Sequence, residues 1–256
     1  MLTIAITPTT RRSRHENFAK LVGNSSFAAR SVKLPKAATM DNRPEQSLLP
    51  STTSAPLIPD RIIPGLYLSD IQTACAVLSP YYPAPHRPEI KYILSIIDRP
   101  DRTPKVHAED EWKFVLKFLK LRDVGTDDLL EILEEACEFI RSSMRNNDGG
   151  ILVHCAKGVS RSASVVLAFV MEDMCLEYDT ALRYVRQFRP KVKPNPGFEA
   201  QLKLWERMEY SIFEADGTTH KEEYNVWKAN NEHATKILAF RILEKGGEQS
   251  KKDGTT

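Results

Sequence analysis

The stretch ILVHCAKGVSRSA, residues 151–163, determines the fold that we expect for this chain. It begins with aliphatic residues, passes through a His-Cys pair and ends in Gly-x-x-Arg-Ser-Ala. A short apolar run that ends at turn residues predicts a buried strand that enters a loop. Residues 165–174 are apolar on nearly every side, which predicts a central, buried helix after the loop. We therefore expect a strand, a glycine-containing loop and a helix in immediate succession.

The predicted loop has the features of a phosphate-binding site. Backbone N–H groups of a loop before a helix can converge on one point, and the helix dipole adds attraction for an anion there. Gly158 permits a positive φ without Cβ strain, and the planar fork of Arg161 suits two phosphate oxygens. The residues expected to surround the phosphate are Ala156, Lys157, Gly158, Val159, Ser160 and Arg161.

Cys155 lies at the expected focus of these donors and is the candidate nucleophile. The field that attracts a phosphate also favours the thiolate, which is the nucleophilic form of cysteine. Ser162 is expected to hydrogen-bond the sulfur and to help it leave, and His154 is expected to orient the loop rather than to transfer protons. The alternative for a single cysteine at a strand end is a buried packing role.

A departing alkoxide or phenoxide needs a proton, which predicts a carboxylic acid on a nearby loop. The segment LRDVGTDDLL offers Asp123, Asp127 and Asp128. Asp127 and Asp128 are explained as acidic residues in the first turn of a helix predicted over residues 127–145. Asp123 has no such structural explanation, and Gly125 is expected to give its loop mobility. Asp123 is therefore the favoured general acid, and its two neighbours are the alternatives.

Strands alternate with helices along the rest of the chain, which argues for an α/β fold with a sheet between helices. Apolar, β-branched runs predict the strands, and apolar residues on one helical face predict the helices. In one helix, Arg183, Arg186 and Arg189 are expected to line the side opposite the apolar residues. The expected strands cover residues 62–63, 66–68, 90–98, 114–121 and 151–153, and the expected helices cover residues 70–78, 127–145, 161–174, 179–189 and 195–213.

Three regions are expected from composition. Residues 1–58 contain eight Lys or Arg and three acidic residues and lack apolar periodicity, so they are expected to be a disordered basic tail. Residues 59–213 form the expected catalytic domain, and residues 214–256 an expected helical extension with a disordered end. The net charge of the chain is +2, so the part after the basic tail is slightly negative. Nucleic acid is therefore not an expected partner.

Cysteine usage and hydropathy bear on the cellular location. Four widely spaced cysteines lack metal-ligand spacing, so we expect free thiols in a reducing compartment and no metal site. No apolar run reaches the ~20 residues of a membrane helix, and no apolar signal segment follows the first methionine. These features favour the cytoplasm, the nucleus or both. A mitochondrial location is the alternative, because the first 40 residues, rich in basic residues, are similar to a transit peptide.

Together these motifs resemble the dual-specificity phosphatases, a branch of the cysteine-dependent protein tyrosine phosphatases. HCAKGVSRSA matches the family signature His-Cys-x-x-Gly-x-x-Arg-Ser, and IPGLYLSD is similar to the opening strand element. Asp123 lies 32 residues before Cys155, where the family has its general acid, and Asp128 is similar to a second acidic position of that loop. RPKVKPNPGFEAQL is similar to a later family segment, in which Asn195 matches an asparagine that braces the phosphate loop. The resemblance covers roughly residues 60–213.

The resemblance implies a compact α/β fold of the cysteine-phosphatase type, with a central mixed sheet flanked by helices. It implies hydrolysis of phosphotyrosine and phosphoserine or phosphothreonine through a cysteinyl phosphate, without a metal or cofactor. Asp123 would be the acid of the first step and the base of the second. A phosphorylated protein, such as a protein kinase, is the expected substrate and partner. The implied catalytic residues are Cys155, Arg161, Asp123 and Ser162, and the implied supporting residues are His154 and Asn195.

Two departures and two other functions stay open. The proline-rich segment SPYYPAPHRPE is a longer loop than the family leads us to expect. Lys157 occupies a position where many members have a small or acidic residue, so it is either a solvated lysine on the rim or a sign of a more highly phosphorylated substrate. A phosphoinositide, RNA or glucan substrate is one alternative function. An inactive phosphate-binding relative is the other, although such proteins usually lack the cysteine, the arginine or the acid.

Overall fold

The computed structural model describes residues 57–82 and 88–236, which belong to one compact unit. The expected basic tail up to residue 56, the middle of the proline-rich loop and the chain after residue 236 lie outside the described residues. Among the helices of the described part, none has the length and apolar character needed to cross a bilayer.

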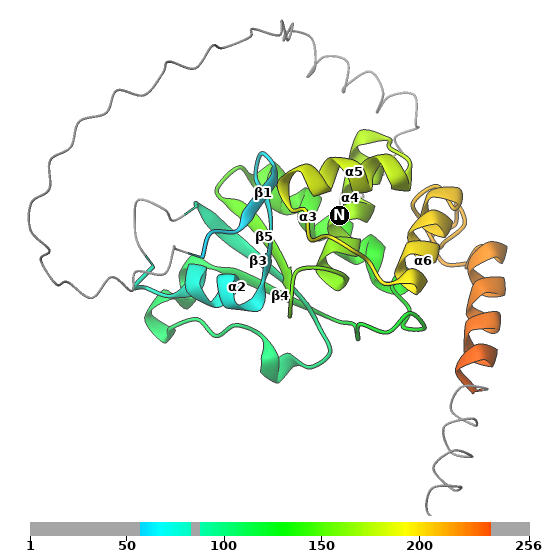
Figure 1. The fold of residues 1–256 in the computed structure, drawn as a ribbon, viewed down its shortest axis with the longest axis horizontal. Helices are drawn as coiled ribbons and strands as arrows, with labels where there is room; N and C mark the ends of the chain where they lie inside the picture. The colour runs from blue at the N-terminus through cyan, green and yellow to red at the C-terminus, as the bar shows by residue number, and fades with distance from the viewer. Residues whose placement is uncertain (1–56, 83–87, 237–256) are drawn as a thin grey trace, which may run out of the picture. The chain divides into compact units, whose positions relative to one another are not determined.

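A mixed five-stranded sheet with the order β1-β2-β5-β3-β4 lies at the centre of the unit (Figure 1). The antiparallel pair β1 and β2 surrounds the predicted Pro-Gly turn, and β2, β5, β3 and β4 run parallel to their neighbours. Parallel strands end at a common edge of the sheet, so the segments after β2, β3, β4 and β5 meet there. The strands are β1 (Asp60–Ile63), β2 (Leu66–Asp70), β3 (Ile90–Ile97), β4 (Val115–Lys120) and β5 (Gly150–Cys155).

Helices cover both faces of the sheet, which confirms the expected α/β fold. One face packs against α2, and the other packs against α3, α4, α5 and α6 (Figure 1). The alternation of side chains along β5 shows this division, because Leu152 packs with α2 whereas Ile151 and Val153 belong to the larger core. The helices are α2 (Ile71–Leu78), α3 (Leu130–Asn146), α4 (Arg161–Met174), α5 (Tyr178–Phe188) and α6 (Pro196–Arg207), and two 3-10 helices, η2 (Pro100–Arg102) and η3 (Ala108–Lys113), lie between β3 and β4.

The central position predicted for the helix after the cysteine loop is confirmed. Every residue of α4 from Arg161 to Glu172 is buried. The helix contacts α3, α5 and α6 as well as β5. Because α4 begins directly after the loop, the packing of the core holds the loop on a rigid support.

Two helix boundaries differ from the predicted ones by more than one residue. α3 begins at Leu130 rather than at residue 127, because Asp127 accepts hydrogen bonds from the backbone N and the guanidinium of Arg122 and stays in the preceding loop. α6 ends at Arg207 because Glu209 and Tyr210 take left-handed φ values of 54° and 62°. The chain becomes helical again at residues 222–236, drawn in orange in Figure 1 and called the C-terminal helix below.

Candidate active site

Cys155 is the last residue of the central strand β5 and lies at the edge where the parallel strands end. Its side chain is buried, with 2% of the residue exposed. The Sγ atom accepts hydrogen bonds from the backbone N of Gly158 at 3.2 Å and from Oγ of Ser162 at 3.1 Å. The contact expected between Ser162 and the sulfur is therefore present in the structure.

The loop over residues 156–161, called the phosphate loop below, has its carbonyl groups directed outward. The carbonyl oxygens of Ala156 and Val159 accept bonds from backbone N–H groups outside the loop, at 3.4 and 2.8 Å. Those of Lys157 and Gly158 accept bonds from the Arg189 guanidinium. In a planar trans peptide the C=O of one residue and the N–H of the next point in opposite directions. The N–H groups of residues 157–160 therefore point to the inner side of the loop, where that of Gly158 donates to the sulfur, as a phosphate-binding loop requires.

Gly158 has the left-handed conformation that the sequence predicts, with a φ of 62°. Neighbouring residues of β2 and Arg189 also leave no space for a side chain at this position. A Cβ atom at this position would lie 2.3 Å from the carbonyl oxygen of Ser69 and 2.4 Å from the Arg189 guanidinium. The curl of the phosphate loop therefore depends on glycine for two reasons, the sign of φ and the close approach of β2.

Arg189 supports the phosphate loop, a role that the sequence analysis missed. The residue is 5% exposed, and its Nε donates to the carbonyl oxygen of Gly158 at 2.7 Å. Its guanidinium also pairs with Asp60 on β1. Helical periodicity placed Arg189 on the side of the helix opposite the apolar residues, and this prediction was wrong. α5 ends at Phe188, and the backbone of Arg189 is not helical, so its side chain does not continue the row formed by Arg183 and Arg186. The Arg-Pro pair directly after the helix was the signal that could have revealed it.

The Arg161 side chain lies at the same edge of the sheet as the cysteine. It is 8% exposed, and Nη1 donates to the carbonyl oxygen of Leu121, after β4, at 3.3 Å. Nη1 also lies 3.9 Å from Oδ1 of Asp98, after β3. Among the described residues, its Nε has no hydrogen-bond partner. A buried donor of this kind suits an anionic ligand, because an unpaired guanidinium N–H is costly to bury.

His154 is buried and is oriented by β3. Its Nε2 lies 2.7 Å from Oγ of Ser95, which is its pairing partner in the sheet. Burial lowers the pKa of His154 to about 4, so the imidazole is neutral at physiological pH. This arrangement agrees with the expected orienting role, since a neutral ring fixed to Ser95 is a poor proton donor.

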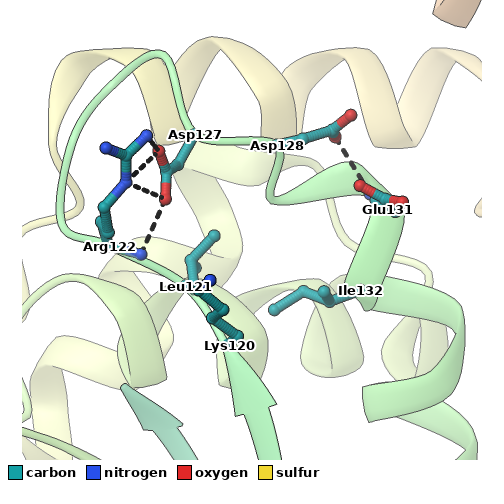
Figure 2. Close-up of a pocket in the computed structure, with 7 residues that line it drawn as sticks. All are labelled: Lys120, Leu121, Arg122, Asp127, Asp128, Glu131 and Ile132. Carbon is teal, nitrogen blue, oxygen red and sulfur yellow. Dashed lines mark hydrogen bonds and ion pairs between the residues drawn. The ribbon is translucent and has the colours of Figure 1, made fainter. Parts of the chain in front are cut away.

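The three carboxylates that the sequence offered as general acid differ in their hydrogen-bond partners and in their exposure. They lie on residues 122–129, called the acid loop below. Asp127 is bonded to Arg122, as Figure 2 shows, and Asp128 accepts bonds from the backbone N of Glu131 and from the Tyr224 hydroxyl. Asp123 is exposed, and its Oδ1 accepts a bond from Nδ2 of Asn195 at 3.0 Å. Of the three carboxylates, Asp123 is the exposed one.

A cavity of about 340 Å³ lies beside the acid loop rather than at the cysteine. Figure 2 shows Arg122 and Asp127 facing each other across the base of the loop, and Asp128 beside Glu131 at the start of α3. The cavity reaches into the space between the end of β4 and the start of α3. Its lining consists of Lys120, Leu121, Arg122, Asp127, Asp128, Glu131 and Ile132.

Asn195 joins the acid loop to the phosphate loop. Its backbone N donates to Oγ of Ser160 at 3.1 Å, while its Nδ2 donates to Asp123. Its Oδ1 accepts from the backbone N of Phe198 at 2.9 Å and thereby caps α6. The residue that the resemblance assigned to bracing the phosphate loop therefore contacts the candidate acid as well.

The acid loop packs tightly against the start of α6 at Gly125. A Cβ atom on Gly197 would lie 2.1 Å from the carbonyl oxygen of Gly125, so two glycines allow the close approach. Nε2 of Gln201 donates to the carbonyl oxygens of Gly125 and Asp127 at 3.3 and 3.0 Å. Gln201 is fully buried and was not recognised from the sequence, although a glutamine among the apolar residues of a helix was the available signal.

Lys157 is exposed on the phosphate loop, next to the exposed Ala156. Its backbone carbonyl contributes to the outward bonding described above. The exposure agrees with the interpretation of a solvated lysine at the rim of the site.

The fold and the cysteine loop place this domain in the class of cysteine-based protein tyrosine phosphatases. Residues 84–208 match the family model described as "Dual specificity phosphatase, catalytic domain". This part of the chain therefore belongs to the dual-specificity phosphatase family, as the motifs led us to expect.

Curated relatives and solved structures agree with this assignment. Dual specificity protein phosphatase MPK-4 of Drosophila melanogaster is 41% identical over 92 residues, which are 36% of this chain and 24% of that protein. Human dual specificity protein phosphatase 7 is 32% identical over 177 residues, 68% of this chain and 38% of that protein. The chain thus spans less than half of the length of either relative.

Two solved structures share the fold. The crystal structure of a mouse putative dual specificity phosphatase complexed with zinc tungstate has a TM-score of 0.52 and 27% identity, covering 63% of this chain and 94% of that chain. The human tyrosine phosphatase-like serine/threonine/tyrosine-interacting protein has a TM-score of 0.51 and 28% identity, covering 59% of this chain and 96% of that chain.

Proposed function

We propose that this chain is a dual-specificity protein phosphatase that hydrolyses phosphotyrosine and phosphoserine or phosphothreonine through a cysteinyl phosphate. The observation that carries the proposal is the position of the Cys155 sulfur. It lies inside a loop whose N–H groups point inward, and it accepts bonds from Gly158 and Ser162. The exposed carboxylate of Asp123 is tied to the same loop through Asn195.

In the first step, the Cys155 thiolate attacks phosphorus and the bond between phosphorus and the ester oxygen breaks. The inward N–H groups and the Arg161 guanidinium stabilise the charge on the phosphoryl oxygens. Asp123, in its protonated form, gives its proton to the departing oxygen, so the alcohol or phenol leaves as a neutral molecule. The products of this step are the free hydroxyl compound and a phosphoryl group bonded to Sγ.

In the second step, water attacks phosphorus and the bond between phosphorus and sulfur breaks. Asp123, now ionised, takes a proton from that water, and inorganic phosphate leaves. Ser162 donates a hydrogen bond to the sulfur as negative charge returns to it, which makes the thiolate a better leaving group. After phosphate release, Asp123 is protonated and Cys155 is a thiolate, so the cycle can repeat.

The proposed substrate is a phosphorylated protein, with a protein kinase among the candidates. One relative bears the name MAP kinase phosphatase with leucine-rich repeats protein 3, from Dictyostelium discoideum, and is 31% identical over 63% of this chain and 17% of that protein. The rim of the site is open, because Ala156, Lys157 and Asp123 are exposed. An exposed rim allows a phosphorylated side chain of a folded protein to approach the loop.

The enzymatic part of the proposal is tested by hydrolysis of aryl phosphates by the full chain. We expect turnover by the wild type and none above background by Cys155→Ser. Asp123→Asn is expected to lose roughly 10²- to 10⁴-fold with a poor leaving group, and much less with a good one, because general acid catalysis matters only when the leaving oxygen is basic. Asp127→Asn is the matched control. Absence of wild-type turnover, or full activity of Asp123→Asn on the poor leaving group, would contradict the proposal.

The substrate is identified by trapping. A Cys155→Ser chain keeps the phosphate loop but lacks the thiolate, so it is expected to retain phosphorylated proteins from a cell lysate. Mass spectrometry then names the captured proteins, and vanadate, a phosphate analogue, is expected to release them. Capture of phosphoinositides rather than phosphoproteins would favour the alternative substrate class that Lys157 suggests.

We also propose that the protein acts in the cytoplasm, the nucleus or both. The support is the sequence argument from free, widely spaced thiols. Imaging of the full chain with a C-terminal fluorescent tag tests the location. Accumulation in mitochondria, abolished by removal of residues 1–58, would instead support the transit-peptide interpretation of the basic tail.

A further inference from the structure

The chain returns to the acid loop after the last helix of the domain. Beyond α6, Phe213 and His220 form an isolated β-bridge, and the backbone N of Lys221 donates to the carbonyl oxygen of Ile212 at 2.8 Å. These contacts lead directly into the C-terminal helix, residues 222–236. The helix is thereby attached to the core at its beginning, next to α6.

Tyr224 joins the C-terminal helix to the acid loop. Its residue is fully buried, and its hydroxyl donates to Oδ2 of Asp128 at 2.8 Å. Its ring packs against those of His220 and Trp227, with centroid distances of 4.9 and 6.1 Å. Burial and the bond to Asp128 raise the pKa of Tyr224, so the hydroxyl stays protonated and acts as a donor over the physiological range. This is a fixed, desolvated hydrogen bond to a charged group, the kind that stabilises most.

A second contact lies two turns further along the helix. Nδ2 of Asn231 donates to the backbone carbonyl oxygen of Thr126, in the middle of the acid loop, at 2.7 Å. Nζ of Lys228 lies between the two contacts, 3.2 Å from the Tyr224 hydroxyl and 3.8 Å from Oδ2 of Asp128. One face of the helix therefore holds the acid loop at two separate points.

The acid loop is neither helix nor strand, so contacts from neighbouring helices hold it in place. The α6 side holds it through Asn195 and Gln201, and the C-terminal helix holds it from Thr126 to Asp128. Asp123 itself is exposed, so its position depends on how firmly the rest of the loop is fixed.

We propose that the C-terminal helix positions the acid loop for proton transfer, with Tyr224 and Asn231 as the positioning residues. The inference rests on the proposed function, because it assigns the helix to the proton-donating step of that reaction. Both residues lie beyond residues 84–208, the part that matches the family model. The extension thus adds to the catalytic domain a support for its general acid.

The test compares full-length Tyr224→Phe, Asn231→Ala and the double variant with Asn230→Ala, an exposed neighbour on the same helix. We measure kcat and KM on aryl phosphates with good and poor leaving groups. We expect kcat on the poor leaving group to fall about 2- to 10-fold for each single variant, the range of one hydrogen bond. KM, and kcat on the good leaving group, are expected to stay within twofold of the wild type.

A second readout does not depend on turnover. Hydrogen exchange of the amides of residues 123–128 is expected to be about 3- to 10-fold faster in Tyr224→Phe and unchanged in Asn230→Ala. Wild-type rates on both substrates by Tyr224→Phe and Asn231→Ala, equal loss on both substrates, or unchanged exchange in the loop would each overturn the positioning role. If the wild type shows no turnover but residues 123–128 still exchange faster in Tyr224→Phe, the proposed function is contradicted and the contact between the helix and the loop is not.

Discussion

Gly158 gives the phosphate loop its shape through its positive φ and through the close approach of Ser69 and Arg189. Gly217 has a similar φ of 71°, but a Cβ atom there would have nothing within 4 Å, so this glycine separates the two effects. Both glycines tolerate a positive φ that alanine adopts at a cost of about 1 kcal/mol. The clash with Ser69 is added only at Gly158.

We therefore predict that Gly158→Ala abolishes most of the phosphatase activity, whereas Gly217→Ala leaves it intact. The added Cβ must displace either β2 or the loop, and both movements turn the N–H groups away from the phosphate. Aryl phosphate hydrolysis and inhibition by inorganic phosphate measure the effect. Retention of normal phosphate affinity by Gly158→Ala would show that the loop does not need this curl.

His154 makes stability depend on pH. Its pKa is about 4 in the folded protein, because burial disfavours the charged ring, and about 6.5 when the chain is unfolded. The unfolded chain therefore binds the proton first as the pH falls, and stability is lost from about pH 6.5 downward. Above pH 6.5 both states are neutral and the effect vanishes.

Denaturant unfolding at pH 7 and pH 5 measures this loss. Each pH unit within the window is worth at most about 1.4 kcal/mol per group. We predict that the wild type loses on the order of 1–2 kcal/mol between these pH values through His154, and that His154→Asn has a correspondingly shallower pH dependence. An identical pH dependence of both proteins would mean that His154 titrates normally in the folded state.

At the level of secondary structure elements, the start of α6 determines where the acid loop lies. Gly197 and Gly125 meet at a distance that excludes any side chain, and Asn195 and Gln201 bond to the loop on either side of this contact. A movement of the loop relative to α6 would therefore displace Asp123. The phosphate loop, by contrast, is fixed by Arg189 and β2.

Gly197→Ala tests this dependence. Its Cβ would lie 2.1 Å from the carbonyl oxygen of Gly125, so the loop must move away from α6. We predict a fall in kcat of about tenfold or more on a poor leaving group, within the contribution of a general acid, and a smaller effect on a good one. Lys203→Ala, on the same helix, is the control. Equal effects on both substrates would place the damage in the phosphate loop instead.

At the scale of the whole molecule, burial is concentrated on β5 and α4. All residues of β5 are buried, as is α4 from Arg161 to Glu172, whereas much of the C-terminal helix is exposed. Amides in the core exchange only by global unfolding, while peripheral elements open locally. The strand that ends in the cysteine is thus part of the most stable region, and the helix that supports the acid is not.

Native-state hydrogen exchange is predicted to be slower in β5 and α4 than in the C-terminal helix. Amides of β5 and α4 are expected to exchange with the free energy of global unfolding, and those of residues 222–236 with a lower one. A helix as protected as β5 would show that the extension unfolds only together with the domain.

Local patterns were sufficient for most of the fold and part of the site. Cys155, Gly158 and Ser162 lie within one continuous motif, so their mutual arrangement follows from a strand, a turn and a helix in sequence. Arg189 and Tyr224 act through the ends of their side chains on segments far away in the chain, and no local periodicity encodes such a contact. The sequence favoured Asp123 over Asp127 and Asp128, but the partners of the three carboxylates, from Arg122, α3, α6 and the C-terminal helix, could not be read from it.

The most direct test of the account is detection of the cysteinyl phosphate. The full chain is mixed with an aryl phosphate, quenched in acid within milliseconds and digested, and the peptide that contains Cys155 is analysed by mass spectrometry. We predict a phosphoryl group on Cys155 that disappears as substrate is consumed and is absent in Cys155→Ser. Turnover without phosphorylation of Cys155, or a phosphoryl group on another residue, would contradict the proposed mechanism.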